Sequence, residues 1–236
     1  MTDITIMMLT RGEPFAERFV RDAEKLAIQL DAQLLIGIDG DDAQPIRQWL
    51  HPAFEPHYSR HLVTVRSNGY LESVHDELLS HVGTRYVLRL DDDERPGQGM
   101  RQWLIDRKYR EHDHWKFPRM ALFQDEDHFL IHPQLWPDHQ TRLSVKNKAG
   151  GRTRVHCGSP YGGGHACPYG IEHWKFLVKS ADERRRLAAH YDAYHPGYGT
   201  GGMLVFNVPE DAVSPPDLQR FIRPLYAEAR DEGARL

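Results

Sequence analysis

Short apolar runs alternate with amphipathic stretches through residues 1–97, and this alternation restricts the possible folds more than any other feature of the sequence. Apolar runs typical of strands lie at 4–10, 33–39, 61–65 and 85–90, and apolar residues at helical spacing lie at 14–30 and 70–82. Strands that alternate with helices indicate right-handed crossovers and a parallel sheet. We therefore expect an α/β fold with a mostly parallel sheet flanked by helices.

The pattern changes after residue 97, where we expect a smaller mixed C-terminal part. A helix is predicted at 98–110, followed by two strands at 114–123 and 128–131 that pair across an acidic turn. At 236 residues and 40% hydrophobic content, the chain is long enough for one sizeable core. We therefore expect a single domain.

Three local signals lie further along the chain. The glycine-rich segment 146–170 is expected to be a mobile loop, of the kind that closes over a reactive ligand and excludes water. Ser180 and Glu183 stand at capping-box spacing, which predicts the start of a helix. The tail from Pro215 is expected to form a final amphipathic helix with a charged end.

The composition limits the classes of partner and compartment. Thirty basic and 34 acidic residues give a formal charge of −4, and no long basic block occurs, so non-specific nucleic-acid binding is not favoured. The N-terminus fits neither a signal peptide nor a membrane span, and we expect a cytoplasmic location. The two cysteines, Cys157 and Cys167, are expected to be free thiols in a reducing compartment.

Clusters of polar residues follow three of the predicted strands. They lie at 10–13, 39–42 and 91–94, and the last belongs to the stretch RYVLRLDDDERP. In parallel sheets, ligands bind beyond the carboxyl ends of the strands, so we expect the three clusters to meet at one edge. Acidic residues often follow strands only because turns are solvated. The repulsion between Asp91 and Asp93, however, favours a bound Mg²⁺ or Mn²⁺, because hard carboxylate oxygens suit these ions.

The stretch YVLRLDDDE, on an α/β half that begins ITIMMLTRGE, resembles the nucleotide-sugar glycosyltransferases of the GT-A fold, in particular the large family two of inverting enzymes. In that family an apolar strand ends in a DxD motif whose acids hold a metal bound to the donor diphosphate. The segments at 135–143 and 171–191 look like later segments of the family, the second as in relatives that act on lipopolysaccharide cores. The resemblance covers residues 4–195.

The resemblance implies a division of the chain and a role for several residues. It implies a nucleotide-binding half at 1–97, an acceptor-binding and catalytic half at 98–210, and a helical tail at 211–236. Asp138 matches the catalytic base, and His173 matches a late metal ligand. The residues implied in donor binding are Thr10, Arg11, Glu13, Asp39, Asp91 and Asp92. Those implied in holding Mn²⁺ or Mg²⁺ are Asp93, His173 and Asp91, with His156, Gln140, Arg142 and Glu94 as supporting residues.

The sequence also departs from the family pattern. An Arg-Asn pair found in relatives is replaced by Val74 and His75, so a donor contact is expected to move to Arg66, Asn68 or Arg89. A family glutamate is replaced by a cysteine in the segment VHC. A zinc site is a second reading of the residues His156, Cys157, His165, Cys167 and His173. Structural zinc sites prefer closely spaced pairs such as CxxC, which this set lacks, so zinc is the less favoured reading.

The leading hypothesis is a metal-dependent inverting glycosyltransferase that moves a sugar from a nucleoside-diphosphate sugar to a hydroxyl acceptor. The acceptor stays open between a glycan, a protein, a small molecule and a modified DNA base. One alternative is a nucleotidyltransferase, which also holds a metal and a nucleotide with carboxylates at the edge of an α/β sheet. The other is a domain that binds a nucleotide sugar without turnover. Release of a nucleoside diphosphate rather than pyrophosphate separates the first two.

Overall fold

The structure is a computed structural model that describes residues 2–52, 59–151, 164–200 and 209–225. It contains a nine-stranded sheet and a two-stranded sheet. The strands are β1 (Ile4–Thr10), β2 (Gln33–Asp39), β3 (Arg60–Val65), β4 (Tyr86–Asp91), β5 (Glu94–Pro96), β6 (His114–Ala121), β7 (His128–Leu130), β8 (Asp138–Val145), β9 (His165–Ala166), β10 (Ile171–His173) and β11 (Ile222–Pro224).

Helices cover both faces of the large sheet. The α-helices are α1 (Ala16–Leu30), α2 (Gln44–Trp49), α3 (His75–Ser80), α4 (Gln98–Ile105), α5 (Lys175–Val178), α6 (Ala181–Tyr194), α7 (Pro209–Ala212) and α8 (Pro215–Phe221). The 3-10 helices are η2 (Leu71–Val74), η3 (Lys108–Glu111) and η4 (Lys146–Lys148). In the part of the chain that the structure describes, no helix has the length and apolar character needed to cross a bilayer.

The large sheet has the strand order β3-β2-β1-β4-β8-β6-β10-β5, with β9 beside β6. Its first four strands are parallel, and β1 lies between β2 and β4. In this register Thr10 pairs with Ile38 and Leu9 pairs with Asp91, so β1, β2 and β4 end at the same edge. The predicted meeting of the three polar clusters at one edge is therefore confirmed.

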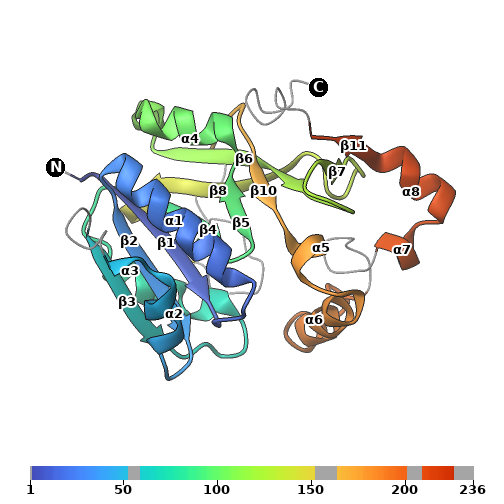
Figure 1. Ribbon diagram of the computed structural model, residues 1–236, viewed down its shortest axis with the longest axis horizontal. Helices are drawn as coiled ribbons and strands as arrows, with labels where there is room; N and C mark the ends of the chain where they lie inside the picture. The colour runs from blue at the N-terminus through green and yellow to red at the C-terminus, as the bar shows by residue number, and fades with distance from the viewer. Residues whose placement is uncertain (1, 53–58, 152–163, 201–208, 226–236) are drawn as a thin grey trace.

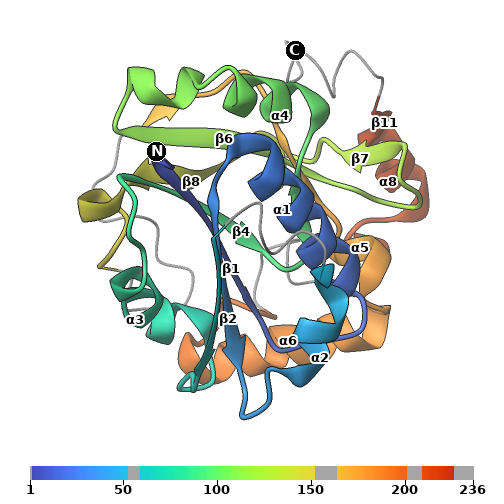
Figure 2. The same ribbon diagram turned by 60° about the vertical axis from the view of Figure 1, so that its left-hand side comes forward.

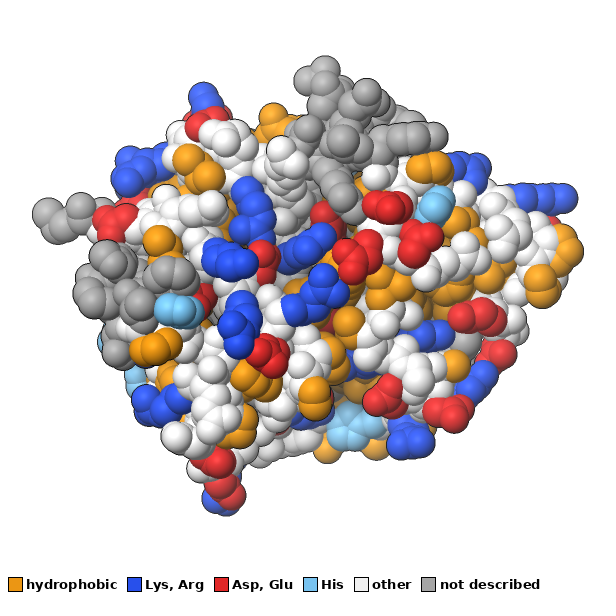
Figure 3. Space-filling view, viewed as in Figure 1, with side chains coloured by type: hydrophobic (Ala, Val, Ile, Leu, Met, Phe, Trp, Pro, Cys, Tyr) orange, Lys and Arg blue, Asp and Glu red, His pale blue; other side chains and the backbone are white. Residues whose placement is uncertain are grey.

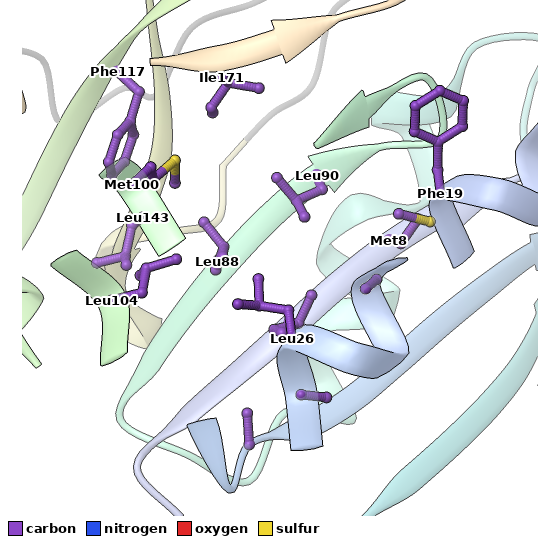
Figure 4. Close-up of a cluster of buried hydrophobic side chains, with 14 of the residues drawn as sticks. Met8, Phe19, Leu26, Leu88, Leu90, Met100, Leu104, Phe117, Leu143 and Ile171 are labelled. Atoms are coloured by element: carbon purple, nitrogen blue, oxygen red, sulfur yellow. The ribbon is translucent and has the colours of Figure 1, made fainter. Parts of the chain in front are cut away.

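Strand β1 is buried on both faces, which explains its unbroken apolar sequence. Met8 points to the face covered by α1 and α4, where it belongs to the main hydrophobic core with Phe19 and Leu26 of α1. Figure 4 shows these side chains together with others from β4, α4, β6, β8 and β10. Met7 points to the opposite face and packs in a separate cluster with Leu78 of α3. Helices on both faces thus hold the parallel strands in place.

The second half joins the sheet through antiparallel strands that the sequence did not predict. Strand β8 enters between β4 and β6 and is antiparallel to both. Strand β10 lies between β6, to which it is parallel, and β5, to which it is antiparallel, so Ile171–His173 pair with Glu94–Pro96, which begin with the last acid of the cluster. Figure 1 shows β6 and β10 running from the half that holds α1–α3 toward the group of α5–α8, β7 and β11.

Some predicted boundaries were wrong. The strands predicted at 114–123 and 128–131 pair only near the turn that joins them, through the antiparallel bridge between Leu122 and Phe129 and the hydrogen bond that Phe123 N donates to the carbonyl oxygen of His128 at 2.9 Å. The main partner of β7 is β11, because the chain returns after α8 and covers the outer edge of β7. The helix predicted at 98–110 ends at Ile105, where the chain turns through Arg107 at a φ of 59° before η3.

Other boundaries were close. The helix predicted at 70–82 is η2 followed by α3, and α1 begins two residues after Pro14. The predicted capping box is present at the start of α6, where Glu183 N donates to Ser180 Oγ at 3.3 Å. The predicted tail helix is α8, and it gives way to β11 at Ile222. Of the predicted loop 146–170, residues 152–163 lie outside the described residues, and the rest contains η4 and β9.

Helix α6 belongs to the C-terminal group, but it also contacts the first half of the chain. His190 Nε2 lies 2.6 Å from the carbonyl oxygen of Gly69, in the loop that follows β3. Gly69 has a φ of 91°, and a Cβ atom there would lie 1.8 Å from the hydroxyl oxygen of Tyr194. Only glycine fits this close approach. Figure 2, turned by 60°, also shows α6 near the lower ends of β1 and β2.

Candidate active site

A cavity of about 360 Å³ lies at the edge where β1 and β4 end, between the parallel strands and the segment α5–α6. Among the residues that the structure describes, six acidic side chains line it, namely Glu13, Glu72, Asp91, Asp92, Asp93 and Asp138. Six basic side chains of the same part of the chain also line it, namely Arg11, Arg89, Arg119, Arg142, Lys175 and Lys179. The cavity therefore holds a nearly balanced set of charges, much of it removed from water.

Asp91 is neutralised by arginines. Arg142, which is 3% exposed, donates from Nη2 to Asp91 and to Glu94 Oε1, the latter at 2.5 Å. Arg89 donates to the other oxygen of Asp91 at 3.1 Å. Burial alone would raise the pKa of Asp91, but Arg142 and then Arg89 outweigh it, so this pKa lies below its ordinary value. The carboxylate is ionised and already paired within the fold.

Asp93 sits in a different environment, beside a histidine and a lysine. Its Oδ1 lies 3.6 Å from His173 Nε2, and both side chains are buried. Burial raises the pKa of Asp93, but His173 and then Lys175 outweigh it and keep this pKa below its usual range. Burial also lowers the pKa of Lys175, to about 8, although Asp93 opposes this shift. Such a buried lysine is costly unless it meets an anion.

Asp92 and Glu13 are close enough for their carboxylates to repel each other. Burial raises the pKa of Asp92 well above its ordinary value, and the nearby carboxylates of Asp93 and Glu13 raise it further. Glu13 Oε2 is buried and has no hydrogen-bond partner within the described part of the chain. A buried acceptor of this kind calls for a donor, such as a ligand hydroxyl.

Asp138 begins β8 and lies on the other side of the cavity. Arg119 of β6 donates from Nε to Asp138 Oδ2 at 2.8 Å, and its Nη2 lies 2.5 Å from the same oxygen. Gln140 Nε2 donates to Asp138 Oδ1 at 2.5 Å. Arg119 also reaches Glu94 Oε1 at 3.4 Å. Burial alone would lower the pKa of Arg119, but Asp138 and then Glu94 outweigh it and raise this pKa.

Of the predicted donor-binding residues at the ends of β1 and β2, Arg11 and Glu13 line the cavity, and Thr10 and Asp39 lie beside it. Arg11 lines the cavity and donates to Asp39 Oδ2 at 3.1 Å. Asp39 also accepts from Ser67, at 2.9 Å from the backbone nitrogen and 2.6 Å from the hydroxyl. Thr10 is buried, and its hydroxyl accepts from the backbone nitrogen of Gly12 at 3.0 Å. Asp39 and Thr10 thus shape the loops around the cavity rather than line it.

The three alternative donor contacts differ in where they lie relative to the cavity. Of the three residues proposed to replace the family's Arg-Asn pair, Arg89 lines the cavity. Arg66 instead pairs with Asp41 at 2.5 Å on the surface, and both side chains are more than three-quarters exposed. The backbone nitrogen of Asn68 donates to Ser73 Oγ at 2.9 Å within its own loop.

The described residues of the alternative zinc site, His165, Cys167 and His173, do not form one cluster. His156 and Cys157 lie outside the described residues. His165 stacks on His112 with ring centroids 3.4 Å apart, away from the cavity. Cys167 is buried, and burial raises the pKa of its thiol to about 12. His173 lies instead beside Asp93.

A divalent cation fits two of the predicted ligands. Asp93 Oδ1 and His173 Nε2 are close enough for one ion to contact both, and carboxylate oxygen and imidazole nitrogen together suit Mn²⁺. Within residues 2–52, 59–151, 164–200 and 209–225, no group of three or more His, Cys, Asp or Glu side chains is arranged to hold a metal. Asp91 is paired with arginines, so a bound ion would need further ligands from a substrate or water.

Several residues of the cavity were not predicted from the sequence. Arg119, Lys175 and Lys179 supply half of the basic lining, and Tyr191 of α6 closes the cavity from the C-terminal side. Burial raises the pKa of Tyr191, and the nearby Glu72 raises it further. A signal was available for the first two, because each is a basic residue within an apolar segment, HWKFPRMALF and IEHWKFLV.

The face that carries α1, α4 and β5 shows Lys and Arg side chains near its centre, with acidic side chains among them (Figure 3). Ion pairs on these elements join Arg101 of α4 to Asp22 of α1, and Arg95 of β5 to Glu172 of β10 at 2.6 Å. The guanidinium of Arg95 also lies 4.7 Å from the ring centroid of buried Trp174. These cations serve contacts within the fold.

Neither the family models nor the curated proteins with which the sequence was compared give a match. Among solved structures, the chain is similar to residues 1–349 of S. aureus TarS, with 9% identity, a TM-score of 0.50, and coverage of 98% of this chain and 88% of that chain. A complex of the same TarS fragment with UDP-GlcNAc has 10% identity and a TM-score of 0.50, covering 82% and 68% of the two chains.

A longer TarS structure gives 9% identity and a TM-score of 0.40, and the chain spans 28% of its length. At these identities the likeness concerns the fold. It agrees with the α/β architecture expected from the resemblance to GT-A enzymes, which the large, mostly parallel sheet confirms.

Proposed function

We propose that this protein is a glycosyltransferase that uses a nucleoside-diphosphate sugar as donor and a hydroxyl group as acceptor. The observation that carries the proposal is one cavity that holds Asp91 and Asp93 at the end of a parallel strand, with Asp138 opposite and buried cations between. The fold supports it, because the matched TarS fragment was crystallised with UDP-GlcNAc.

The cavity has separate places for the two parts of the donor. Glu13 Oε2, buried and without a hydrogen-bond partner in the described chain, suits a ribose or sugar hydroxyl. Lys175 and Lys179 lie beside the carboxylates of Asp92 and Asp93, where their charge can meet a diphosphate. Arg11 follows β1 and donates to Asp39 at the end of β2, and this position suits the nucleoside part of the donor.

In the proposed reaction, Asp138 acts as the general base. The hydroxyl oxygen of the acceptor attacks the anomeric carbon and forms the new glycosidic bond, while its proton passes to a carboxylate oxygen of Asp138. The bond between the anomeric carbon and the diphosphate oxygen breaks, and its electron pair leaves with the nucleoside diphosphate. Attack from the side opposite the leaving group inverts the anomeric centre.

Metal dependence is part of the proposal. Asp93 and His173 would hold Mn²⁺ or Mg²⁺, which would offset the charge that develops on the leaving diphosphate. Lys175 and Lys179 would offset part of the same negative charge, because both line the cavity near Asp93. The proposed acceptor is a hydroxyl group of a glycan, a protein, a small molecule or a modified DNA base.

A thermal-shift screen tests the proposal directly. The protein is mixed with nucleoside diphosphates and nucleotide sugars, each with Mn²⁺ and with EDTA. A ligand at a hundredfold excess over its Kd stabilises the native state by about 2.7 kcal/mol, so a true donor should raise Tm by about 5 °C or more. Donors that bind are then incubated with the enzyme, and the products are separated. Release of nucleoside diphosphate supports the proposal, whereas pyrophosphate, or binding without any product, contradicts it.

A further inference from the structure

Arg119 and Asp138 are direct partners across two strands. They face each other in the antiparallel register of β6 and β8, so backbone hydrogen bonds fix the spacing between them. The Arg119 side chain is 13% exposed and contacts Asp138 Oδ2 with both Nε and Nη2. This geometry leaves the guanidinium little freedom to turn away from the carboxylate.

The two oxygens of Asp138 are held by different donors. Arg119 takes Oδ2, and Gln140 donates to Oδ1. Since each carboxylate oxygen can accept two hydrogen bonds, Asp138 keeps room for a hydroxyl proton while the plane of its carboxylate is fixed. Because the two Arg119 nitrogens fill Oδ2, the carboxylate presents its one remaining lone pair, on Oδ1, in a fixed direction.

Arg119 has a second anion within reach. Its Nη1 donates to Glu94 Oε1 at 3.4 Å, and the same oxygen accepts from Arg142, which also binds Asp91. When Asp138 takes a proton and becomes neutral, the guanidinium still faces the charge of Glu94. The chain from Asp91 through Arg142, Glu94 and Arg119 to Asp138 also joins the acids at the end of β4 to the other side of the cavity.

We infer that Arg119 is the positioning residue of the transfer reaction, which aims the Asp138 carboxylate at the acceptor hydroxyl and holds it in register with the donor-binding acids. The inference rests on the proposed glycosyltransferase function. Arg119 takes no part in bond making, since the proton of the acceptor goes to Asp138 and the electron pair of the broken bond leaves with the diphosphate. Its effect falls on the rate of the chemical step rather than on donor affinity.

The test uses Arg119→Met and Arg119→Lys in the full chain, with UDP-GlcNAc and a panel of other nucleoside-diphosphate sugars as donors. Release of nucleoside diphosphate is followed with water or an added acceptor. Misplacement of a catalytic group can lower rates about 100-fold, so Arg119→Met should lower kcat by about that factor while donor KM stays within about twofold. Lysine keeps the charge without the planar fork, so Arg119→Lys should recover part of the loss.

Two further variants separate positioning from a structural role. Arg101→Met removes another partly buried arginine of an ion pair, with Asp22, outside the cavity, and should leave kcat unchanged. In the double variant with Asp138→Asn, Arg119→Met should cause no further loss, because the base it aims is already gone. If Arg119→Met does not fold, Arg119→Lys carries the same comparison of kcat with KM.

The outcomes are distinct. Wild-type protein that binds donors but releases no nucleoside diphosphate would overturn the proposed function, and this inference with it. An active wild type with unchanged kcat in Arg119→Met or Arg119→Lys would overturn the positioning role alone. So would a loss that adds fully to that of Asp138→Asn, or an equal loss in Arg101→Met.

Discussion

Strands β1 and β4 have charged groups at both of their ends, and the two groups differ in depth. At the amino end, Asp3 accepts from Tyr109 Oη and Arg110 Nε, each at 2.7 Å, and the arginine is 43% exposed. At the carboxyl end, Asp93 and Arg142 are at most 6% exposed. An ion pair at the surface loses little hydration free energy, whereas a buried one loses several kcal/mol of it, by order of magnitude. The buried carboxyl-end cluster therefore agrees with the proposed binding and catalysis better than with a role in stability.

The largest effect is expected from Asp138→Asn. The amide keeps the shape of the side chain but cannot take a proton, so kcat should fall by about 10² to 10⁴ while donor Kd stays near that of the wild type. Product analysis gives kcat, and calorimetric titration gives Kd. Asp3→Asn, the matched change at the amino end, should leave kcat unaltered. A wild-type rate in Asp138→Asn would exclude it as the base.

Asp93→Ala should remove the part of donor affinity that depends on metal. It removes one of the two side chains proposed to hold a cation, and it leaves His173 with no carboxylate at 3.6 Å. Donor Kd is measured by titration with Mn²⁺ and with EDTA. We expect the two values to converge in the variant and to differ in the wild type. Equal values in the wild type would show that Asp93 needs no metal partner.

Lys175→Met tests whether the buried ammonium meets the diphosphate. A hydrogen bond to a charged group contributes roughly 1.5 to 3 kcal/mol, so donor Kd should rise by about tenfold or more. Affinity for the parent nucleoside, which lacks phosphate, should not change. Lys25→Met, on the exposed surface of α1, is the control. An unchanged ratio of diphosphate to nucleoside affinity would place the phosphates elsewhere in the cavity.

The smallest effect is expected from Asp3→Asn, at the amino end of β1, and it concerns stability. Burial raises the pKa of Asp3, but hydrogen bonds from Arg110 and Tyr109 outweigh it, so this pKa lies below its ordinary value. The stabilisation is therefore present above the unfolded pKa and is lost as pH falls through the folded one. Asp3→Asn should lower the free energy of unfolding by about 0.5 kcal/mol at pH 7, and by less in acid. Urea unfolding at both pH values checks this, and an equal loss at both would contradict it.

The parallel half of the fold was predictable because its signals are local. Strands β1, β2 and β4 are buried on both faces and have largely apolar sequences, and an acid marks the point where β2 and β4 leave the core. Asp91, Asp93 and Asp138 were named from motif resemblance, and the structure brings all three to one cavity. Their catalytic and metal-binding roles remain predictions.

In the other half, several elements were predicted, but the way its strands enter the sheet was not predictable from local pattern. Strand β8 has the sequence DHQTRLSV, and its polar residues suggest a loop, although Arg142 within it is buried. Its burial comes from insertion between β4 and β6, which are distant in sequence. The roles of Arg119 and Lys175 in the cavity were not predicted for the same reason, since they depend on Glu94 and Asp93, which are distant in sequence. Periodicity within a window contains no information about such pairs.

Strand β10 has a consequence for how the molecule reaches its native state. His173 pairs with Glu94 on one side and with Ala121 on the other, so both ladders join segments far apart in sequence. Such contacts form slowly, because the loops between them must first be closed. The carboxylates at the end of β4 therefore gain their histidine only after the later segment has docked. During synthesis on the ribosome, a chain that has not yet emerged past residue 173 would have the parallel strands but no complete site.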